Sequence, residues 1–125
     1  MATDSIERRH YKRYIFSASE ETTGAFSLAD AEGPYDFTAH ILNISEGGLG
    51  LAMPKSLDRI RPGSMLVFAG AQGKTPLGFL SGTKMKIRWL QDIPRLNYKL
   101  FGCEFIDATA DMRLQIKEMI GRQSP

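Results

Sequence analysis

Two short groups of polar residues have the side-chain types and the spacing needed to bind an anion. The first consists of Arg8, Arg9 and Arg13, in which Arg9 and Arg13 stand four positions apart with a His, a Tyr and a Lys between them. A guanidinium group offers a planar fork of donors that binds phosphate oxygens or the O6 and N7 edge of a guanine, and it also stacks on a base. This group therefore predicts a mobile cationic clamp.

The second group lies where an expected strand turns through glycine. It is the segment Asn43-Ile-Ser-Glu-Gly-Gly48, which supplies an amide, a hydroxyl and backbone that glycine leaves uncovered. The segment predicts a fixed polar ledge, because Asn43 and Ser45 can both donate and accept hydrogen bonds. Taken singly, each group has a simpler interpretation. A basic run is often a solvated leader, and Asn, Ser and Gly are common in ordinary turns.

A set of short strands would have to position these two groups. Apolar runs separated by turn residues predict strands over residues 14–18, 25–28, 37–44, 49–53, 64–69, 77–90 and 98–105. In the fourth of these strands, large apolar residues alternate with Gly48, Gly50 and Ala52. The glycines leave room on that face for something to approach the backbone.

The last two expected strands supply much of the predicted core. Every second residue there should face inward: Met85, Ile87, Trp89, Phe101, Cys103 and Phe105. The intervening Lys84, Lys86 and Arg88 are expected on the solvent face, where they could still add positive potential near the site. Cys103 has no evident base beside it and is interpreted as packing, not as a nucleophile.

The period changes from two to 3.6 near the C-terminus. Met112, Ile116, Met119 and Ile120 share one face of an amphipathic helix, which is expected to pack on the strands. Asp107 or Thr109 could cap its start, and a glycine at position 121 suits the position just after its end. Strands of this length followed by one helix predict an all-β barrel or sandwich with a C-terminal helix.

Taken in order and at this spacing, the two polar groups resemble the signatures of the PilZ domain family, bacterial receptors for the second messenger cyclic di-GMP. The patterns of that family are RxxxR and [D/N]xSxxG. Arg9 and Arg13 match the first pattern, and Asn43, Ser45 and Gly48 match the second. The resemblance covers about residues 7–121 and includes three further features, which are the Pro62-Gly63 turn, the strand ending in Trp89 and the strand Gly102-Cys-Glu-Phe105.

The resemblance implies a six- to seven-stranded antiparallel PilZ-type β-barrel with a C-terminal α-helix. Residues 7–122 would form this single domain after a flexible N-terminus of residues 1–6. Within the domain, residues 7–14 would be the ligand-binding arm and about residues 108–121 the helix.

The same resemblance implies a role for each residue of the two groups. Arg9 and Arg13 would hold guanine and phosphate groups of cyclic di-GMP. Asn43 and Ser45 would bind a guanine edge and a nearby phosphate, and Gly48 would allow the turn. An arginine at the position of Arg8 is compatible with two stacked, intercalated ligand molecules.

The implied function is that of a cyclic di-GMP receptor whose arm becomes ordered on binding and which signals through a protein partner. Two alternatives remain. One is a PilZ-like adaptor that has lost the ligand and serves only in protein interaction. The other is a small barrel that grips single-stranded nucleic acid with its basic aromatic arm. No cofactor is expected apart from the ligand, and no metal.

Composition narrows the classes of protein further. With 42% hydrophobic and 24% charged residues, the chain is typical of a soluble globular domain. No segment approaches the roughly 18 uncharged apolar residues of a membrane-spanning helix. We therefore expect a cytoplasmic protein without membrane insertion. A single Cys and two His favour neither a disulfide nor a zinc site. Paired acids and a nucleophile–base pair are missing, so an enzyme is not expected.

The charge is distributed unevenly along the chain. The formal net charge is +2, yet residues 7–14 alone hold four basic residues and one acidic residue. The remainder of the chain is therefore nearly neutral. A small concentrated cationic arm suits a compact dianion better than a long polyanion, which makes nucleic acid a less favoured partner than a nucleotide messenger.

Overall fold

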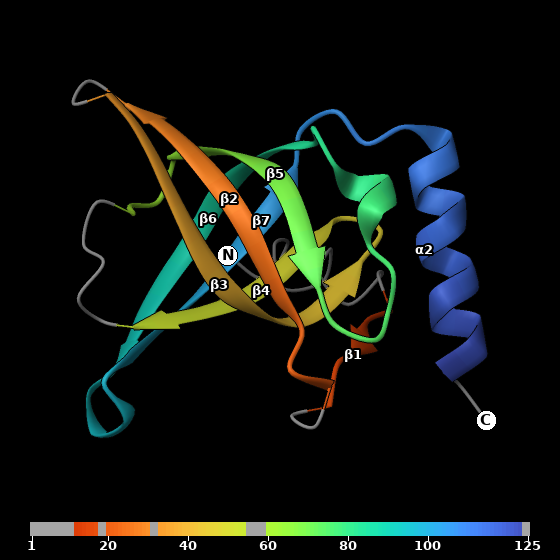
Figure 1. Cartoon of the computed structure of the whole chain (residues 1–125), viewed down its shortest axis with the longest axis horizontal. Helices are drawn as coiled ribbons and strands as arrows, with labels where there is room; N and C mark the ends of the chain where they lie inside the picture. Colours follow the sequence, from red (N-terminus) through yellow and green to blue (C-terminus); the bar gives the residue numbers. More distant parts are fainter. Residues whose placement is uncertain (1–11, 18–19, 31–32, 55–59, 124–125) are drawn as a thin grey trace, which may run out of the picture.

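The strands form one closed antiparallel sheet in the computed structural model, which describes residues 12–17, 20–30, 33–54 and 60–123 (Figure 1). The sheet has the order β1-β3-β2-β5-β6-β7-β4, and a further pairing of β3 with β4 closes it into a barrel. The strands are β1 (Tyr14–Ile15), β2 (Thr23–Asp30), β3 (Gly33–Ser45), β4 (Gly48–Pro54), β5 (Met65–Gln72), β6 (Lys84–Ile93) and β7 (Tyr98–Phe105). The helix α2 (Ala110–Gln123) follows β7, which confirms the predicted barrel with a C-terminal helix.

The long strand β3 closes the barrel and also holds β1. Its first part pairs with β2, from Gly33 opposite Asp30 to His40 opposite Thr23. Its second part pairs with β4 on one side and with β1 on the other, where Asn43 is the register partner of both Gly50 and Ile15. The short strand after the basic run therefore lies directly beside the second polar group.

Alternation along the strands fills the barrel with apolar side chains. In β4 and β7 the expected inward residues are all buried, with exposed fractions of 8% or less: Leu49, Leu51, Met53, Phe101, Cys103 and Phe105. Phe26 packs edge-on against Phe68 with ring centroids 5.5 Å apart. The predicted helix stripe is also buried, so α2 covers one side of the barrel (Figure 1) with Met112, Ile116, Met119 and Ile120.

Two β-bulges change which residues face outward. In β6 the register passes from Ile87 opposite Cys103 to Trp89 opposite Gly102, which leaves Arg88 as an extra residue. The predicted core position of Trp89 is therefore wrong, because one inserted residue inverts the alternation and leaves the indole 36% exposed.

The second bulge lies in β3. Ile41 pairs with Leu51 and Asn43 pairs with Gly50, so Leu42 is the extra residue. Strict alternation from Ile41 would turn Asn43 into the core. The bulge instead turns Asn43 outward and places Ile44, which is fully buried, on the inner side.

Local expectations between β5 and β7 and at the helix ends need correction. The strand expected over residues 77–90 begins only at Lys84. Before it, a 3₁₀ turn, η2 (Gly78–Leu80), buries Leu80 and is followed by Gly82 at φ 85°. A second 3₁₀ turn, η3 (Pro94–Leu96), separates β6 from β7.

The helix also ends later than the sequence indicated. Position 121 lies inside α2, which continues to Gln123, so the glycine there does not stop the helix. At the other end Thr109 is the cap, because its Oγ1 accepts a hydrogen bond from the Met112 amide at 3.1 Å. Asp107 accepts instead from the Lys84 amide at 3.2 Å.

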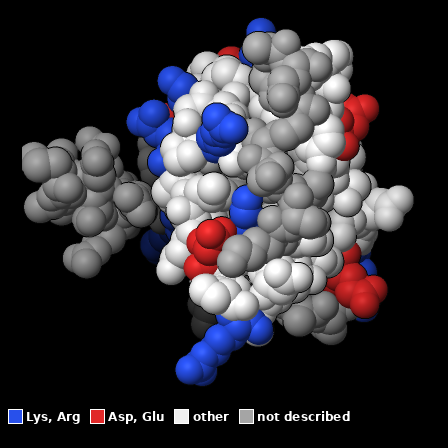
Figure 2. Space-filling model, turned by 90° about the vertical axis from the view of Figure 1, so that its left-hand side faces the viewer, with Lys and Arg blue, Asp and Glu red and all other residues white. Residues whose placement is uncertain are grey.

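Charges of both signs are mixed on the face of the barrel that points away from α2. Figure 2 shows Lys and Arg side chains gathered at the upper left of this face, with Asp and Glu side chains at its lower and right-hand parts. The visible charge on this face is therefore not of a single sign.

Candidate functional site

A groove of about 680 Å³ runs over the outside of the barrel across β3, β4, β7 and β6. Four residues in register cross its floor from strand to strand: Asn43, Gly50, Gly102 and Trp89. The two middle residues are glycines and the two outer ones carry large polar or aromatic side chains. The floor of the groove is therefore lowest in the middle, where the residues have no side chains. On each side a wall is formed by a residue that a β-bulge turns outward.

The wall side chains lean over the glycines. A Cβ atom on Gly50 would lie 2.7 Å from the Asn43 Nδ2 atom, and one on Gly102 would overlap the Trp89 indole nitrogen. The glycine face of β4, expected to allow close approach to the backbone, is thus partly covered by the protein's own side chains. A flat ligand that enters the groove meets an amide on one side and an indole on the other.

The two polar groups of the sequence meet at the amide wall. Arg13 lies just before β1, and its Nη1 donates a hydrogen bond to Asn43 Oδ1 at 2.6 Å. Both residues line the groove. Register explains the contact, because Ile15 in β1 pairs with Asn43 in β3. Arg8 and Arg9 lie outside the described residues.

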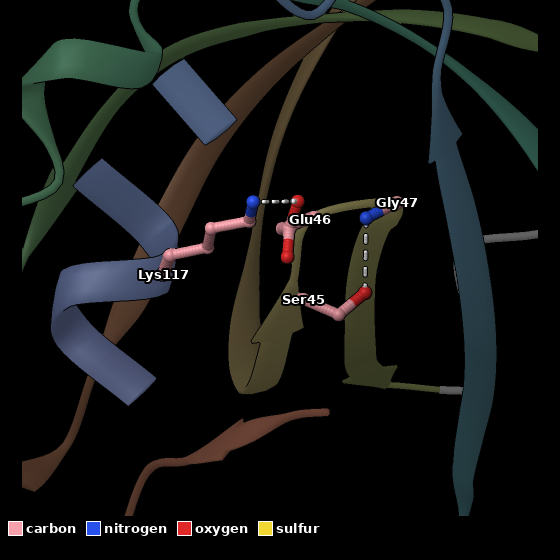
Figure 3. Close-up of polar contacts among 4 residues, drawn as sticks. All are labelled: Ser45, Glu46, Gly47 and Lys117. Carbon is pink, nitrogen blue, oxygen red and sulfur yellow. Dashed lines mark hydrogen bonds and ion pairs between the residues drawn. The ribbon is translucent and has the colours of Figure 1, made fainter. Parts of the chain in front are cut away.

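Ser45 shapes the turn that follows β3. Only 4% of Ser45 is exposed, and its Oγ accepts a hydrogen bond from the Gly47 amide at 3.2 Å (Figure 3). Beside it, Glu46 forms an ion pair with Lys117 of α2, with Nζ and Oε1 3.9 Å apart. The same turn that carries the second polar group therefore touches the C-terminal helix.

Close packing between two strands requires a glycine at position 48. It begins β4 and pairs with Ser45 on one side and Glu104 on the other. A Cβ atom at this position would overlap the carbonyl oxygen of Cys103 in β7. The turn itself does not require a positive φ at this residue, and the structure instead shows a close approach of two backbones.

Basic residues outnumber acidic ones along the groove. Lys86 and Arg88 of β6 line it together with Arg13, and Glu104 is the carboxylate among its lining residues. Arg88 Nε and Glu104 Oε1 form an ion pair at 3.3 Å, and both side chains are about half exposed. The lining therefore carries a net charge of about +2, which favours an anion of matching charge.

Trp89 and Glu104 line the groove although neither was predicted there. Lys86 and Arg88, which were expected on the solvent face with positive potential near the site, line it as well. A signal for Trp89 was present. Leu90 directly follows Trp89, just as Ile44 directly follows Asn43. In each strand, the apolar residue therefore stands at a position that strict alternation from the preceding core residues would place on the outer face. Two consecutive residues that could both face the core indicate a bulge.

Two other reactive side chains are Cys103, which borders the groove from the buried side, and His40. Burial raises the pKa of the Cys103 thiol from 9.0 to about 12, so this thiol stays protonated and is a poor nucleophile. His40 packs edge-on against Tyr98, with ring centroids 6.4 Å apart. Over the described ranges, no cluster of three or more His, Cys, Asp or Glu could hold a metal ion, and no helix is long and apolar enough to cross a membrane.

Comparison with protein families gives one match over almost the whole chain. The sequence model of the PilZ domain matches residues 7–122. Among curated proteins, none matches this chain in sequence.

Solved structures share the barrel. The PilZ domain of YcgR from Escherichia coli with c-di-GMP is 16% identical with a TM-score of 0.61, over 92% of this chain and 90% of that one. The Bacillus subtilis inhibitor of motility, MotI/DgrA, is 18% identical with a TM-score of 0.58, over 93% of this chain and 51% of that one. PlzA of Borreliella burgdorferi, in complex with c-di-GMP, is 14% identical with a TM-score of 0.57, over 100% of this chain and 60% of that one. This chain thus spans about half the length of a relative such as MotI/DgrA.

Proposed function

The chain belongs to the PilZ domain family, and from that premise we propose that it is a receptor for cyclic di-GMP that binds its ligand in the groove between Asn43 and Trp89. The proposed activity is recognition of a ligand, not catalysis. The proposal carries over to this chain the ligand that the YcgR and PlzA structures contain.

The observation that carries the proposal is the hydrogen bond between Arg13 and Asn43 at 2.6 Å. One residue comes from the RxxxR pattern and the other from the [D/N]xSxxG pattern, and they lie 30 positions apart in the sequence. Their contact places donors and acceptors of both patterns at one edge of the same groove. Such a contact is not expected between a solvated basic leader and an ordinary turn that are unrelated in function.

The groove offers what a guanine nucleotide requires. Asn43 can accept from and donate to a base edge, and the guanidinium of Arg13 can bind a phosphate or a guanine. Trp89, which is 36% exposed, provides an aromatic surface on the opposite wall, and base–aromatic stacking contributes about 1–3 kcal/mol per base. We assign Arg8 and Arg9 to the same ligand as further phosphate and guanine contacts, from their positions in the family pattern.

Charge and energy are consistent with a dianionic ligand. Cyclic di-GMP carries two phosphate charges, which match the net charge of about +2 along the groove lining. Each hydrogen bond to a charged group contributes roughly 1.5–3 kcal/mol. Three such contacts and one stacked base would together contribute about 5.5–12 kcal/mol, and the roughly −8.2 kcal/mol of micromolar binding lies within this range.

The proposed output is ordering of the arm. Residues 7–14 would fold over the groove when the ligand binds, and the covered groove would form a new surface for a protein partner. Slower amide hydrogen exchange in residues 7–14 at saturating cyclic di-GMP would support this step. Unchanged exchange there would refute it while leaving ligand binding intact.

Titration calorimetry with cyclic di-GMP tests the central proposal. Wild type should bind with a defined stoichiometry of one or two ligands, and Arg13→Ala should bind at least about tenfold more weakly, because a charged hydrogen-bonding group is lost. Arg113→Ala, which removes an exposed arginine from α2, is the matched control and should bind like wild type. Trp89 is the single tryptophan of the chain, so its fluorescence provides a second reading from inside the groove.

Two results would favour the alternatives. No heat and no change in Trp89 fluorescence at high micromolar cyclic di-GMP would favour a PilZ-like adaptor that binds only protein. Binding of oligonucleotides that tightens with their length and falls steeply with salt would favour a single-stranded nucleic-acid binder.

A further inference from the structure

The last residue of the described helix is attached to the first strand of the sheet. The Ile15 amide donates to Gln123 Oε1 at 2.9 Å, and Gln123 Nε2 donates to the Ile15 carbonyl oxygen at 2.7 Å. One side-chain amide thus satisfies both polar groups of one backbone residue, as a neighbouring strand would.

This attachment adds to a short strand pairing and to the burial of Phe16, which directly follows β1 and is 7% exposed. The strand is two residues long, and β3 lies on one side of it. Ile15 is 54% exposed, so burial of its side chain contributes little. On the side away from β3, Gln123 takes the place of a missing strand for Ile15.

The position of Gln123 on α2 follows from the buried stripe. Gln123 stands four positions after Met119 and seven after Ile116, both of which are buried against the barrel. Residues at this spacing share one face of a helix. The packing of α2 on the core therefore directs the Gln123 side chain toward the barrel edge where β1 lies.

We propose that Gln123 is a positioning residue for ligand binding, which holds β1 in register and thereby keeps Arg13 against Asn43 at the groove. This inference rests on the proposed function, because it assigns Gln123 to the cyclic di-GMP site. Arg13 precedes Ile15 by two residues, and the same Ile15 pairs with Asn43 in β3. Gln123 does not line the groove, so any effect on the ligand passes through β1.

Positioning of this kind changes affinity through the population of the competent form. If β1 leaves β3 for part of the time, the apparent dissociation constant rises in inverse proportion to the fraction with Arg13 in place. Loss of two neutral hydrogen bonds shifts the docking equilibrium of β1 about fivefold or more, and the fraction with Arg13 in place falls about three- to tenfold where the undocked form becomes the commoner one. By reciprocity, the bound ligand must tighten the contact between Gln123 and Ile15 by the same factor. The last turn of α2 then reports whether the groove is occupied.

The test compares two glutamines on the same helix. Gln123→Ala should weaken cyclic di-GMP binding about three- to tenfold in calorimetry and should speed exchange of the Ile15 amide hydrogen in the ligand-free protein. Gln115→Ala is the matched control, because Gln115 bonds to Asp111 of its own helix at 3.1 Å, and it should change neither quantity. In an Arg13→Ala background, Gln123→Ala should have less than about a twofold further effect on affinity, because the group that it positions is gone.

The affinities of the single and double variants decide whether Gln123 has a positioning role. Unchanged affinity in Gln123→Ala, or a further loss of the full size when Arg13 is absent, would overturn the positioning role. Should wild type fail to bind cyclic di-GMP, the proposed function fails by itself. The side-chain amide NMR signals of Asn43 in the ligand-free protein then decide: a shift in Gln123→Ala but not in Gln115→Ala supports positioning of Arg13, and no shift overturns it.

Discussion

Substitution of Gly48 by alanine separates two reasons why the family pattern ends in glycine. One reason would be access, with the bare backbone left free for the ligand. The other is the packing seen here, in which a Cβ at Gly48 would overlap the Cys103 carbonyl oxygen and lie 3.1 Å from the Glu104 Cα atom. The second reason predicts a loss of stability that is present without any ligand.

The size of this loss follows from what must move. The atoms in the way belong to the β7 backbone, which pairs with β4 from Gly48 to Pro54 and cannot turn aside as a side chain would. Overpacking of this kind costs about 1–3 kcal/mol, and alanine returns about 0.4–1 kcal/mol by restricting the unfolded chain. Because backbone atoms cannot move aside, the overpacking cost lies at the upper end of its range, and we expect a net loss of about 2 kcal/mol, or about 8 °C in melting temperature for a domain of this size.

Thermal unfolding of two glycine variants measures the effect. Gly48→Ala should melt about 8 °C below wild type. Gly121→Ala is the control, because nothing lies within 4 Å of a Cβ there and the residue is inside α2. Alanine is about 1 kcal/mol better than glycine in a helix, so the control should melt a few degrees above wild type. If Gly48→Ala melts like wild type but no longer binds cyclic di-GMP, access is the reason and the packing argument is wrong.

Two further predictions concern the groove and the core. Glu104→Gln should tighten cyclic di-GMP binding about two- to fivefold at low salt and less at 0.5 M salt, because it removes a negative charge from the lining; weaker binding in calorimetry would mean that the carboxylate itself contacts the ligand. The Cys103 thiol, with its pKa raised from 9.0 to about 12 by burial, should resist thiol reagents at pH 8 until the protein is unfolded. Because the pKa of the thiol is higher in the folded protein than in the unfolded chain, its contribution to stability is complete below pH 9 and declines between pH 9 and pH 12. The melting temperature of Cys103→Ala should therefore fall less than that of wild type over this range. An equal fall in both proteins would contradict this prediction.

Periodicity predicted the parts of the fold that face the core. In β4 the alternation of Leu49, Leu51 and Met53 with small residues has one geometric solution, because a strand with one buried face must put all three inside. The helix stripe was equally informative, since four apolar residues at helical spacing need a surface to cover. Hydrophobic burial is a property of the residues themselves, which is why sequence alone predicted it.

The walls of the groove could not be predicted in the same way. Asn43 was identified through its motif and Trp89 was assigned to the core, yet the same kind of bulge turns both outward. A bulge depends on how two strands pair and has no composition of its own. The long expected strand over residues 77–90 failed for a related reason. Leu77 and Leu80 are buried, but they belong to the turn around η2, because apolar residues in short runs fit either conformation.

The two bulges have a consequence for how their strands would tolerate the loss of a residue. Leu42 and Arg88 are each one residue more than the pairing of their strands requires, and both have side chains that are more than one third exposed. A chain lacking these two residues would pair without bulges, with Asn43 directly after Ile41 and Trp89 directly after Ile87, so Asn43 and Trp89 would still face outward. Each bulge therefore holds one residue that the alternation of its strand does not need, and loss of that residue would leave both wall side chains on the outer face. In a barrel of this kind, a strand can lose its bulged residue without inverting its buried face, whereas a regular strand that loses one residue turns every later side chain to the opposite face.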